Sequence, residues 1–287
     1  MAPAAPAVER LRAVAVNGTT LHFRVLGDTG TPVVFVHGSL DNLGTWSAQD
    51  TAFARTYRVL VYSRRYHPPN PQVADGQVYS PKLHAEDLAA LLLRLELAPA
   101  HVVGSSYGAY TALALARDHP SLVRSLVLAE PPIASLLSGT TGGDSVRYAV
   151  FANSLDPARA AFARGDSIAG LRAFVDGVLG RVGAYDALPP AARAHLARHA
   201  FEMRLEMLAN REQYLPPVSC ADLGRLSVPV LIVRGQRSGP FFQLISDELA
   251  RCLRNDSTVS IPGAAHGMHA ENPRYFNAIL RRYLAGR

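Results

Sequence analysis

The stretch HVVGSSYGAY, residues 101–110, places two serines side by side between two glycines. It follows a short apolar run directly and precedes the helical pattern TALALAR. A serine hydroxyl becomes a nucleophile for acyl transfer when a neighbouring base removes its proton. Gly and Ser after an apolar run are also ordinary turn chemistry, so the rest of the chain must decide between a plain turn and a nucleophile.

The elements around this stretch alternate short apolar strands with helical patterns. The segment LRAVAVNGTTLHFRVLG, residues 11–27, predicts a hairpin around Asn17 and Gly18. Strands alternating with helices predict an α/β fold with a mostly parallel twisted sheet flanked by helices. The further predicted strands are PVVFVHG (32–38), YRVLVYS (57–63), HVVGSS (101–106), VRSLVLAE (123–130), VPVLIVRG (228–235) and STVSIP (257–262).

Reactive side chains follow several of these strands. Ligands bind beyond the carboxyl ends of the strands in sheets of this kind, so residues just after a strand are candidates for a site. A nucleophile, an acid, a candidate base and anion donors would meet at one edge, which a plain turn does not require. The residues concerned are Ser39, Arg64, Arg65, Ser106, Glu130, Arg237, Ser238 and His266.

The order HGSLDNLGTW, GSSYG and PGAAH resembles the α/β-hydrolase fold superfamily over about residues 10–285, apart from a middle insertion. The resemblance implies that Ser106, the middle residue of G-x-S-x-G, is the nucleophile. Gly104 and Gly108 flank it because the strained strand-to-helix turn leaves no room for side chains there. Ser105 is expected to pack against the core.

The resemblance also implies the groups that assist the serine. The backbone N–H groups of Ser39 and Tyr107 are expected to form an oxyanion hole. His37 is expected to shape the loop that carries Ser39. The implied base is His266 in PGAAH, and His269, three residues further on, is the alternative.

The catalytic acid departs from the common pattern. Most relatives carry Asp three residues after the glycine that ends the strand 228–235, whereas this chain has Ser238, which cannot stabilise an imidazolium by charge. Some relatives, such as haloalkane dehalogenases, place the acid at the end of the strand next to the nucleophile strand. Glu130 is therefore the predicted acid, and the alternative is that it only caps the turn before Pro131. Asp247 and Asp256 are poorer candidates.

A serine at this turn excludes the alkyl-ester chemistry of dehalogenases and epoxide hydrolases, which use Asp there. It predicts cleavage of an ester-type bond, a carboxylester, lactone or thioester, through an acyl-enzyme on Ser106. The same sheet and triad also support lyases, carbon–carbon bond hydrolases and small-molecule binding proteins, so these stay open as alternatives.

A helical, Ala/Arg-rich insertion interrupts the strand pattern. The predicted organisation is a loose tail over residues 1–8, a hydrolase core over 9–130 and 227–287, and a helical cap over 131–226. Such caps set the size and shape of the substrate. Four apolar cap residues either line a pocket or pack on the sheet: Phe174, Val175, Val178 and Leu179.

The loop SRRYHPPNP follows the strand 57–63 at the functional edge. Arg64, Arg65 and Tyr66 could hold a substrate carboxylate by charge-assisted hydrogen bonds. The alternative is that these arginines brace the cap or the loop. Asp41 either pairs with one of them or caps the helix that begins near Thr45.

Composition narrows the class of protein. With 287 residues, 48% of them apolar, the chain can bury a large core, and its apolar runs fall short of the about 20 residues that cross a bilayer. The net charge of +6 comes from scattered arginines, which argues against nucleic-acid binding. We expect a small-molecule substrate as the partner, no membrane association, and no cofactor or metal; the oligomeric state stays open.

The N-terminal sequence and the cysteines bear on the compartment. The first residues lack the pattern of a secretory signal, so a cytoplasmic protein is expected. Cys220 and Cys252 are far apart in the sequence and have no metal-ligand spacing, so neither a disulfide nor a zinc site is expected.

Overall fold

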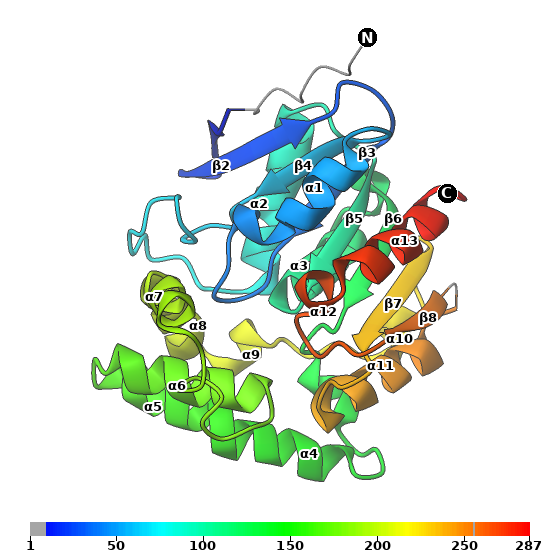
Figure 1. Cartoon of the computed structure of the whole chain (residues 1–287). Coiled ribbons are helices and arrows are strands. Elements are labelled where there is room, and N and C mark those ends of the chain that lie inside the picture. Colours follow the sequence, from blue (N-terminus) through cyan, green and yellow to red (C-terminus); the bar gives the residue numbers. More distant parts are fainter. Residues whose placement is uncertain (1–9, 255) are drawn as a thin grey trace.

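The computed structural model describes residues 10–254 and 256–287, so the predicted tail, residues 1–8, lies outside the described residues. The strands form one sheet in the order β1-β2-β4-β3-β5-β6-β7-β8 (Figure 1). The pairs β1–β2 and β2–β4 are antiparallel and every other pair is parallel. The bounds are β1 Arg12–Val16, β2 Thr19–Leu26, β3 Pro32–Val36, β4 Arg58–Tyr62, β5 Ala100–Ser105, β6 Val123–Ala129, β7 Val230–Gly235 and β8 Asp256–Ile261.

Helices cover both faces of this sheet. The helices of the core are η1 Leu43–Trp46, α1 Ser47–Phe53, α2 Pro81–Arg94, α3 Tyr107–Asp118, η2 Pro120–Leu122, α11 Pro240–Cys252, α12 Met268–Glu271 and α13 Pro273–Leu284. The helices between β6 and β7 are η3 Ala134–Leu137, α4 Gly143–Val150, the π-helix η4 Phe151–Leu155, α5 Asp156–Ala163, α6 Ser167–Val178, α7 Pro190–Ala197, α8 Ala200–Leu208, α9 Arg211–Tyr214 and α10 Cys220–Leu223.

Alternation along the central strands builds two apolar layers. Val34 and Val102 pack in a cluster with residues of α2, α3 and α11, whereas Val33 and Val103 pack in a second cluster with residues of α1 and α13. Successive side chains of a strand point to opposite faces, and strands of a parallel sheet are buried on both. The predicted α/β fold with a mostly parallel sheet is confirmed.

The hairpin also has the predicted turn. Asn17 has φ +45° and Gly18 has φ +75°, and β1 pairs with β2 from Val16 opposite Thr19. Two successive positive φ values are what a two-residue hairpin turn requires, and Asn followed by Gly adopts them at little cost. Residues 11–27 therefore close one edge of the sheet.

We call residues 131–226 the cap segment. Figure 1 shows helices α4 to α8 gathered as a separate layer, below and to the left of the sheet. An apolar cluster fills this layer, including Phe162, Leu171 and Met203, and it continues onto Tyr66 and Tyr107 of the core. The cap segment therefore packs on the edge of the sheet where β5 gives way to α3.

One expectation from the sequence is wrong. Cys220 and Cys252 form a disulfide, with their Cα atoms 4.9 Å apart. The two residues lie 32 positions apart, but β7 returns the chain so that α10 packs beside α11. Spacing in the sequence carries no signal of such a pairing. None of the helices within residues 10–254 and 256–287 has the length and apolar character needed to span a bilayer.

Removing the disulfide should destabilise the fold. The variant Cys220→Ser/Cys252→Ser is expected to lose about 2–4 kcal/mol of unfolding free energy, because the bond restricts the unfolded chain. Urea unfolding of the variant, and of the wild type with and without dithiothreitol, measures this loss. If a thiol reagent modified both cysteines of the unfolded, unreduced wild type, the disulfide assignment would be contradicted.

Candidate active site

Ser106 occupies a sharp turn between a strand and a helix. β5 ends at Ser105 and α3 begins at Tyr107, and Ser106 between them has φ +53° and ψ −125°. Such a backbone is uncommon for a residue with a side chain and is concentrated at functional sites. A Cβ at Gly104 would lie 2.5 Å from Gly108 O, and one at Gly108 would lie 2.2 Å from Val36 O. The two glycines are therefore sterically required.

Glu130 and His266 lie together, as the strand ends suggested. Glu130 follows β6 with φ +49° and is fully buried. His266 Nδ1 donates to Glu130 Oε2 at 2.7 Å, and the Gly235 N–H donates to Glu130 Oε1 at 2.7 Å. Because the carboxylate accepts a hydrogen bond from Nδ1, that nitrogen carries the proton. The lone pair of the ring is then on Nε2.

The imidazole is held beside the pocket that Ser106 lines. Phe242 stacks on the His266 ring with centroids 4.0 Å apart, and Phe242 and Ser106 line the same pocket. His266 Nε2 is buried and has no hydrogen-bond partner among the described residues. Hydrogen bonds between a catalytic serine and its base are often long in free proteins and tighten with substrate.

A glycine that the sequence did not single out brings the pair together. A Cβ at Gly235 would lie 2.3 Å from Ala265 O and 2.7 Å from Ala264 O. The segment before His266 can cross the end of β7 only because position 235 has no side chain. The same residue uses its N–H to hold Glu130, so Gly235 serves both members of the pair.

The alternatives for base and acid lie elsewhere. His269 is buried against Trp46, with ring centroids 4.5 Å apart, and burial lowers its pKa to about 4. The Ser238 hydroxyl is buried without a hydrogen-bond partner among the described residues. Asp247 pairs with Arg234 at the surface. Among the described residues, none of these side chains forms a hydrogen bond or ion pair with Glu130 or His266.

The segment His37–Gly38–Ser39, which we call the oxyanion loop, passes directly over the serine. A Cβ at Gly38 would lie 3.0 Å from Ser106 Cβ, and Ser39 lines the pocket. His37 Nδ1 and Arg64 Nη2 both donate to Gly38 O at 2.9 Å. In a trans peptide the C=O and the following N–H point in opposite directions, so these two bonds aim the Ser39 N–H away from Arg64.

Of the two predicted donors, Ser39 lines the same pocket as Ser106, and Tyr107 follows Ser106 in the chain. Tyr107 is the first residue of α3, where helix N–H groups are free and the helix dipole favours negative charge. His37 Nε2 accepts from the Arg64 N–H at 2.9 Å while Nδ1 donates, so both ring nitrogens are occupied in shaping the loop. Burial lowers the pKa of His37 well below its ordinary value, which keeps the ring neutral.

The arginines considered for substrate binding are engaged within the protein. The buried Arg64 guanidinium donates to His37 O, Gly38 O and Tyr79 Oη. Arg65 forms a bidentate pair with Asp87 and reaches Asp75, which also accepts from Tyr66 Oη. These contacts are those of residues that brace the loop, which is the alternative weighed from the sequence.

The capping role considered for Asp41 is wrong. Asn42 is the N-cap of η1 and accepts from the Gly44 N–H at 2.8 Å. Asp41 accepts from the Asn42 N–H instead, and burial raises its pKa to about 6. Asn and Asp cap helices equally well, so their order along the chain could not decide between them.

A pocket of about 690 Å³ opens above Ser106. Its walls come from α4, η4, α6, α9 and α11 and are mostly apolar, with Val150, Leu155, Phe174, Phe241 and Phe242 among them. A π-helix such as η4 is frequent at functional sites. This volume lies in the range of pockets that bury most of a small organic ligand.

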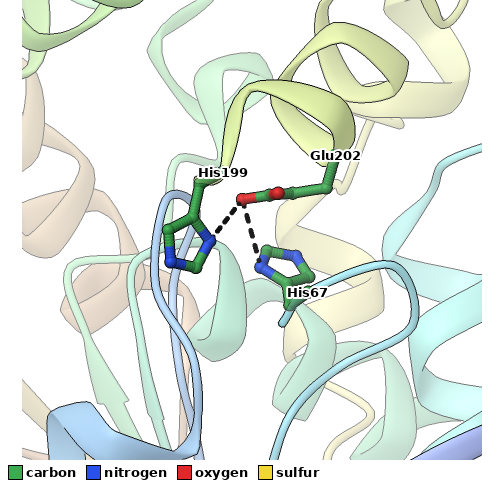
Figure 2. A group of neighbouring side chains, drawn as sticks. All are labelled: His67, His199 and Glu202. Atoms are coloured by element: carbon green, nitrogen blue, oxygen red, sulfur yellow. Dashed lines mark hydrogen bonds and ion pairs between the residues drawn. The ribbon is translucent and has the colours of Figure 1, made fainter. Parts of the chain in front are cut away.

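A buried polar cluster ties the cap segment to the core (Figure 2). Glu202 Oε1 accepts from His199 Nδ1 at 2.9 Å and lies 3.4 Å from His67 Nδ1. These residue types can hold a metal ion, and their ligand atoms lie within 4.8 Å of one another.

Hydrogen bonds occupy both nitrogens of His67, whereas Glu202 Oε2 and His199 Nε2 are buried without a partner among the described residues. His67 Nδ1 lies 2.9 Å from Asp41 O, and because a carbonyl only accepts, that nitrogen carries the proton and has no lone pair for a metal. Tyr79 Oη, 3.1 Å from His67 Nε2, then donates to it. Burial lowers the pKa of His199 to about 3 and raises that of Glu202. No sequence pattern predicts this contact, since it joins a cap helix to a core loop.

Several known proteins are similar to this chain in sequence. The family model for the α/β hydrolase fold matches residues 31–172. An uncharacterized hydrolase of Bacillus subtilis, YraK, is 32% identical over 124 residues, 43% of this chain and 45% of that protein. The mouse sn-1-specific diacylglycerol lipase ABHD11 is 26% identical over 278 residues, 90% of this chain and 83% of that protein. The match to the Bacillus protein thus spans less than half of its length.

Solved structures share the fold. The structure of Est816, an N-acyl homoserine lactone degrading enzyme, has a TM-score of 0.74 at 23% identity and covers 95% of this chain and 100% of its own. Carboxylesterase CesB from Bacillus subtilis has a TM-score of 0.75 at 18% identity and covers 98% of this chain and 93% of its own. At these identities the likeness shows the fold.

Gly235→Ala should separate His266 from Glu130. Its Cβ would meet two carbonyl oxygens, so the loop must move, at a cost of about 1–3 kcal/mol. Urea unfolding measures the cost, and the NMR signal of the His266 Nδ1 proton reports the hydrogen bond. Gly239→Ala is the matched control, because its Cβ meets nothing within 4 Å. Equal behaviour of the two variants would contradict the packing argument.

Proposed function

Because the chain belongs to the α/β-hydrolase fold superfamily, we propose that it is a serine hydrolase that cleaves an ester-type bond of a small organic molecule. The observation that carries the proposal is the buried Glu130–His266 hydrogen bond beside the turn that exposes Ser106. An oriented histidine whose Nε2 has no partner among the described residues is the group that a serine nucleophile needs.

In the acylation step Ser106 Oγ attacks the substrate carbonyl carbon and His266 Nε2 takes the serine proton. The carbonyl oxygen becomes an oxyanion, which accepts hydrogen bonds from the Ser39 and Tyr107 N–H groups. His266 then gives its proton to the leaving oxygen or sulfur as the bond to the carbonyl carbon breaks. The acyl group stays on Ser106.

In the deacylation step water attacks the acyl carbon and His266 takes a proton from it. A second oxyanion collapses, the bond to Ser106 Oγ breaks, and His266 returns the proton to the serine. A carboxylic acid leaves. No redox partner is needed, and Glu130 stays ionised while it stabilises the imidazolium in both steps.

Glu130 can replace an acid at position 238 because its two oxygens are fixed. Oε1 is held by the Gly235 N–H and Oε2 by His266 Nδ1, so the carboxylate has one orientation. The N–H also stabilises the charge of a carboxylate that is fully buried. Ser238 lies near the usual place of the acid but offers a neutral hydroxyl.

The substrate class follows from the pocket. Its mostly apolar walls and volume of about 690 Å³ suit an apolar acyl or alcohol group next to the scissile bond. A relative is named as a lipase, and two proteins of the same fold are named as a carboxylesterase and a lactone-degrading enzyme, which supports a carboxylester or lactone as the substrate.

A fluorophosphonate probe tests the proposal directly. It phosphonylates an activated serine and adds its mass to the intact protein. We expect rapid labelling of the wild type, none of Ser106→Ala, and labelling slowed by about 10²–10⁴-fold in Glu130→Gln, because a neutral amide no longer holds the reactive tautomer. Ser238→Ala is the matched control and should label like the wild type.

Two outcomes would contradict the proposal in different ways. A folded wild type that does not label argues for a binding protein, which would keep its ligand affinity in Ser106→Ala. Normal labelling of Glu130→Gln would leave the nucleophile but remove Glu130 as the acid.

A further inference from the structure

Two glutamates of the cap helix α8 are completely buried. Glu202 and Glu206 each have 0% exposure and lie four positions apart, which places them on the same face of the helix. A buried glutamate is rare without a partner that repays its loss of hydration. Glu202 finds partners in the cluster of Figure 2, whereas Glu206 reaches the candidate active site.

Glu206 joins two walls of the pocket. Its Oε1 accepts from Ser39 Oγ at 2.7 Å and from Tyr214 Oη at 2.8 Å. Ser39 belongs to the oxyanion loop and Tyr214 to α9, and both line the pocket above Ser106. One buried oxygen therefore links the core loop to the cap segment.

The contact continues to the second proposed oxyanion donor. The ring of Tyr214 stacks on the ring of Tyr107, with centroids 5.3 Å apart and planes 9° apart. Tyr107 Oη also donates to Tyr214 O at 3.0 Å. Glu206 thus bonds to one donor residue and to the residue that packs on the other.

Arg64 holds the backbone of the same loop. Its guanidinium donates to the carbonyl oxygens of His37 and Gly38, whereas Glu206 accepts from the side chain of Ser39. Burial raises the pKa of Glu206, and the Ser39 hydroxyl and the Arg64 charge oppose this rise. The peptide that carries the Ser39 N–H is therefore fixed both at its carbonyl and through its side chain.

We propose that Glu206 is a positioning residue that aims the Ser39 N–H at the substrate oxyanion, so that docking of cap helix α8 and assembly of the oxyanion hole are one event. The inference rests on the proposed hydrolase function. The competing interpretation is that Glu206 only anchors the cap. The two differ in their consequences for kcat, because a displaced oxyanion donor weakens the transition state more than the bound ester.

The test is steady-state hydrolysis of p-nitrophenyl butanoate, a small neutral probe. Glu206→Leu removes the acceptor and should lower kcat by about 10–100-fold with KM changed less than about 3-fold, since a small misplacement of a donor has effects of this size. Glu206→Gln keeps an accepting oxygen and should retain most of the kcat. Glu202→Gln, on the same helix and equally buried, should behave like the wild type.

Ser39→Ala gives an independent arm if Glu206→Leu does not fold. It keeps the backbone N–H, removes the hydroxyl from the core side, and should reproduce the loss of kcat. The double variant Ser39→Ala/Glu206→Leu should be no slower than the slower single variant, because both changes remove the same hydrogen bond.

The outcomes that would overturn this inference alone differ from those that would overturn the proposed function. Losses that multiply in the double variant, equal losses in Glu206→Gln and Glu206→Leu, or a normal kcat in both Ser39→Ala and Glu206→Leu would overturn the positioning role while the wild type remains an active hydrolase. A wild type that neither hydrolyses the ester nor reacts with the fluorophosphonate would overturn the proposed function and the inference together.

Discussion

A buried carboxylate shared between one strand end and one loop is the interaction on which the site depends. Glu130 has no contact with water, so its charge must be met by hydrogen bonds, and the Gly235 N–H and His266 Nδ1 supply them. The backbone around this pair is strained and crowded. Glu130 has a positive φ, and position 235 tolerates no Cβ. These unfavourable local conformations are tolerated because they orient the His266 imidazole.

Local patterns in the sequence predict much of this arrangement. The apolar strands fix the sheet, the glycines around Ser106 fix the turn, and the rule that ligands bind at strand ends puts Glu130 and His266 in the same place. Position 238 carries a serine, and Glu130 stands at the strand end where some members of the superfamily carry the acid. Their catalytic roles are our proposal; their contact is a property of the structure.

What the sequence could not predict are contacts between segments that no pattern relates. Cys220 and Cys252 pair because β7 brings α10 to α11. Glu206 meets Ser39 across 167 positions, and nothing in AFEMRLEML, the sequence of α8, marks this glutamate as buried. The rule that ligands bind beyond the strand ends locates site residues in the core, but no such rule locates site residues in the cap segment.

In the proposed mechanism Ser106 attacks the substrate while the Ser39 and Tyr107 N–H groups receive the developing charge. A crystal structure of the protein after reaction with a phosphonate tests it most directly. We expect phosphorus bonded to Ser106 Oγ and the phosphonyl oxygen within hydrogen-bond distance of both N–H groups. The hydrogen bond between His266 and Glu130 should be retained. An adduct on another residue, or a phosphonyl oxygen turned away from both N–H groups, would contradict it.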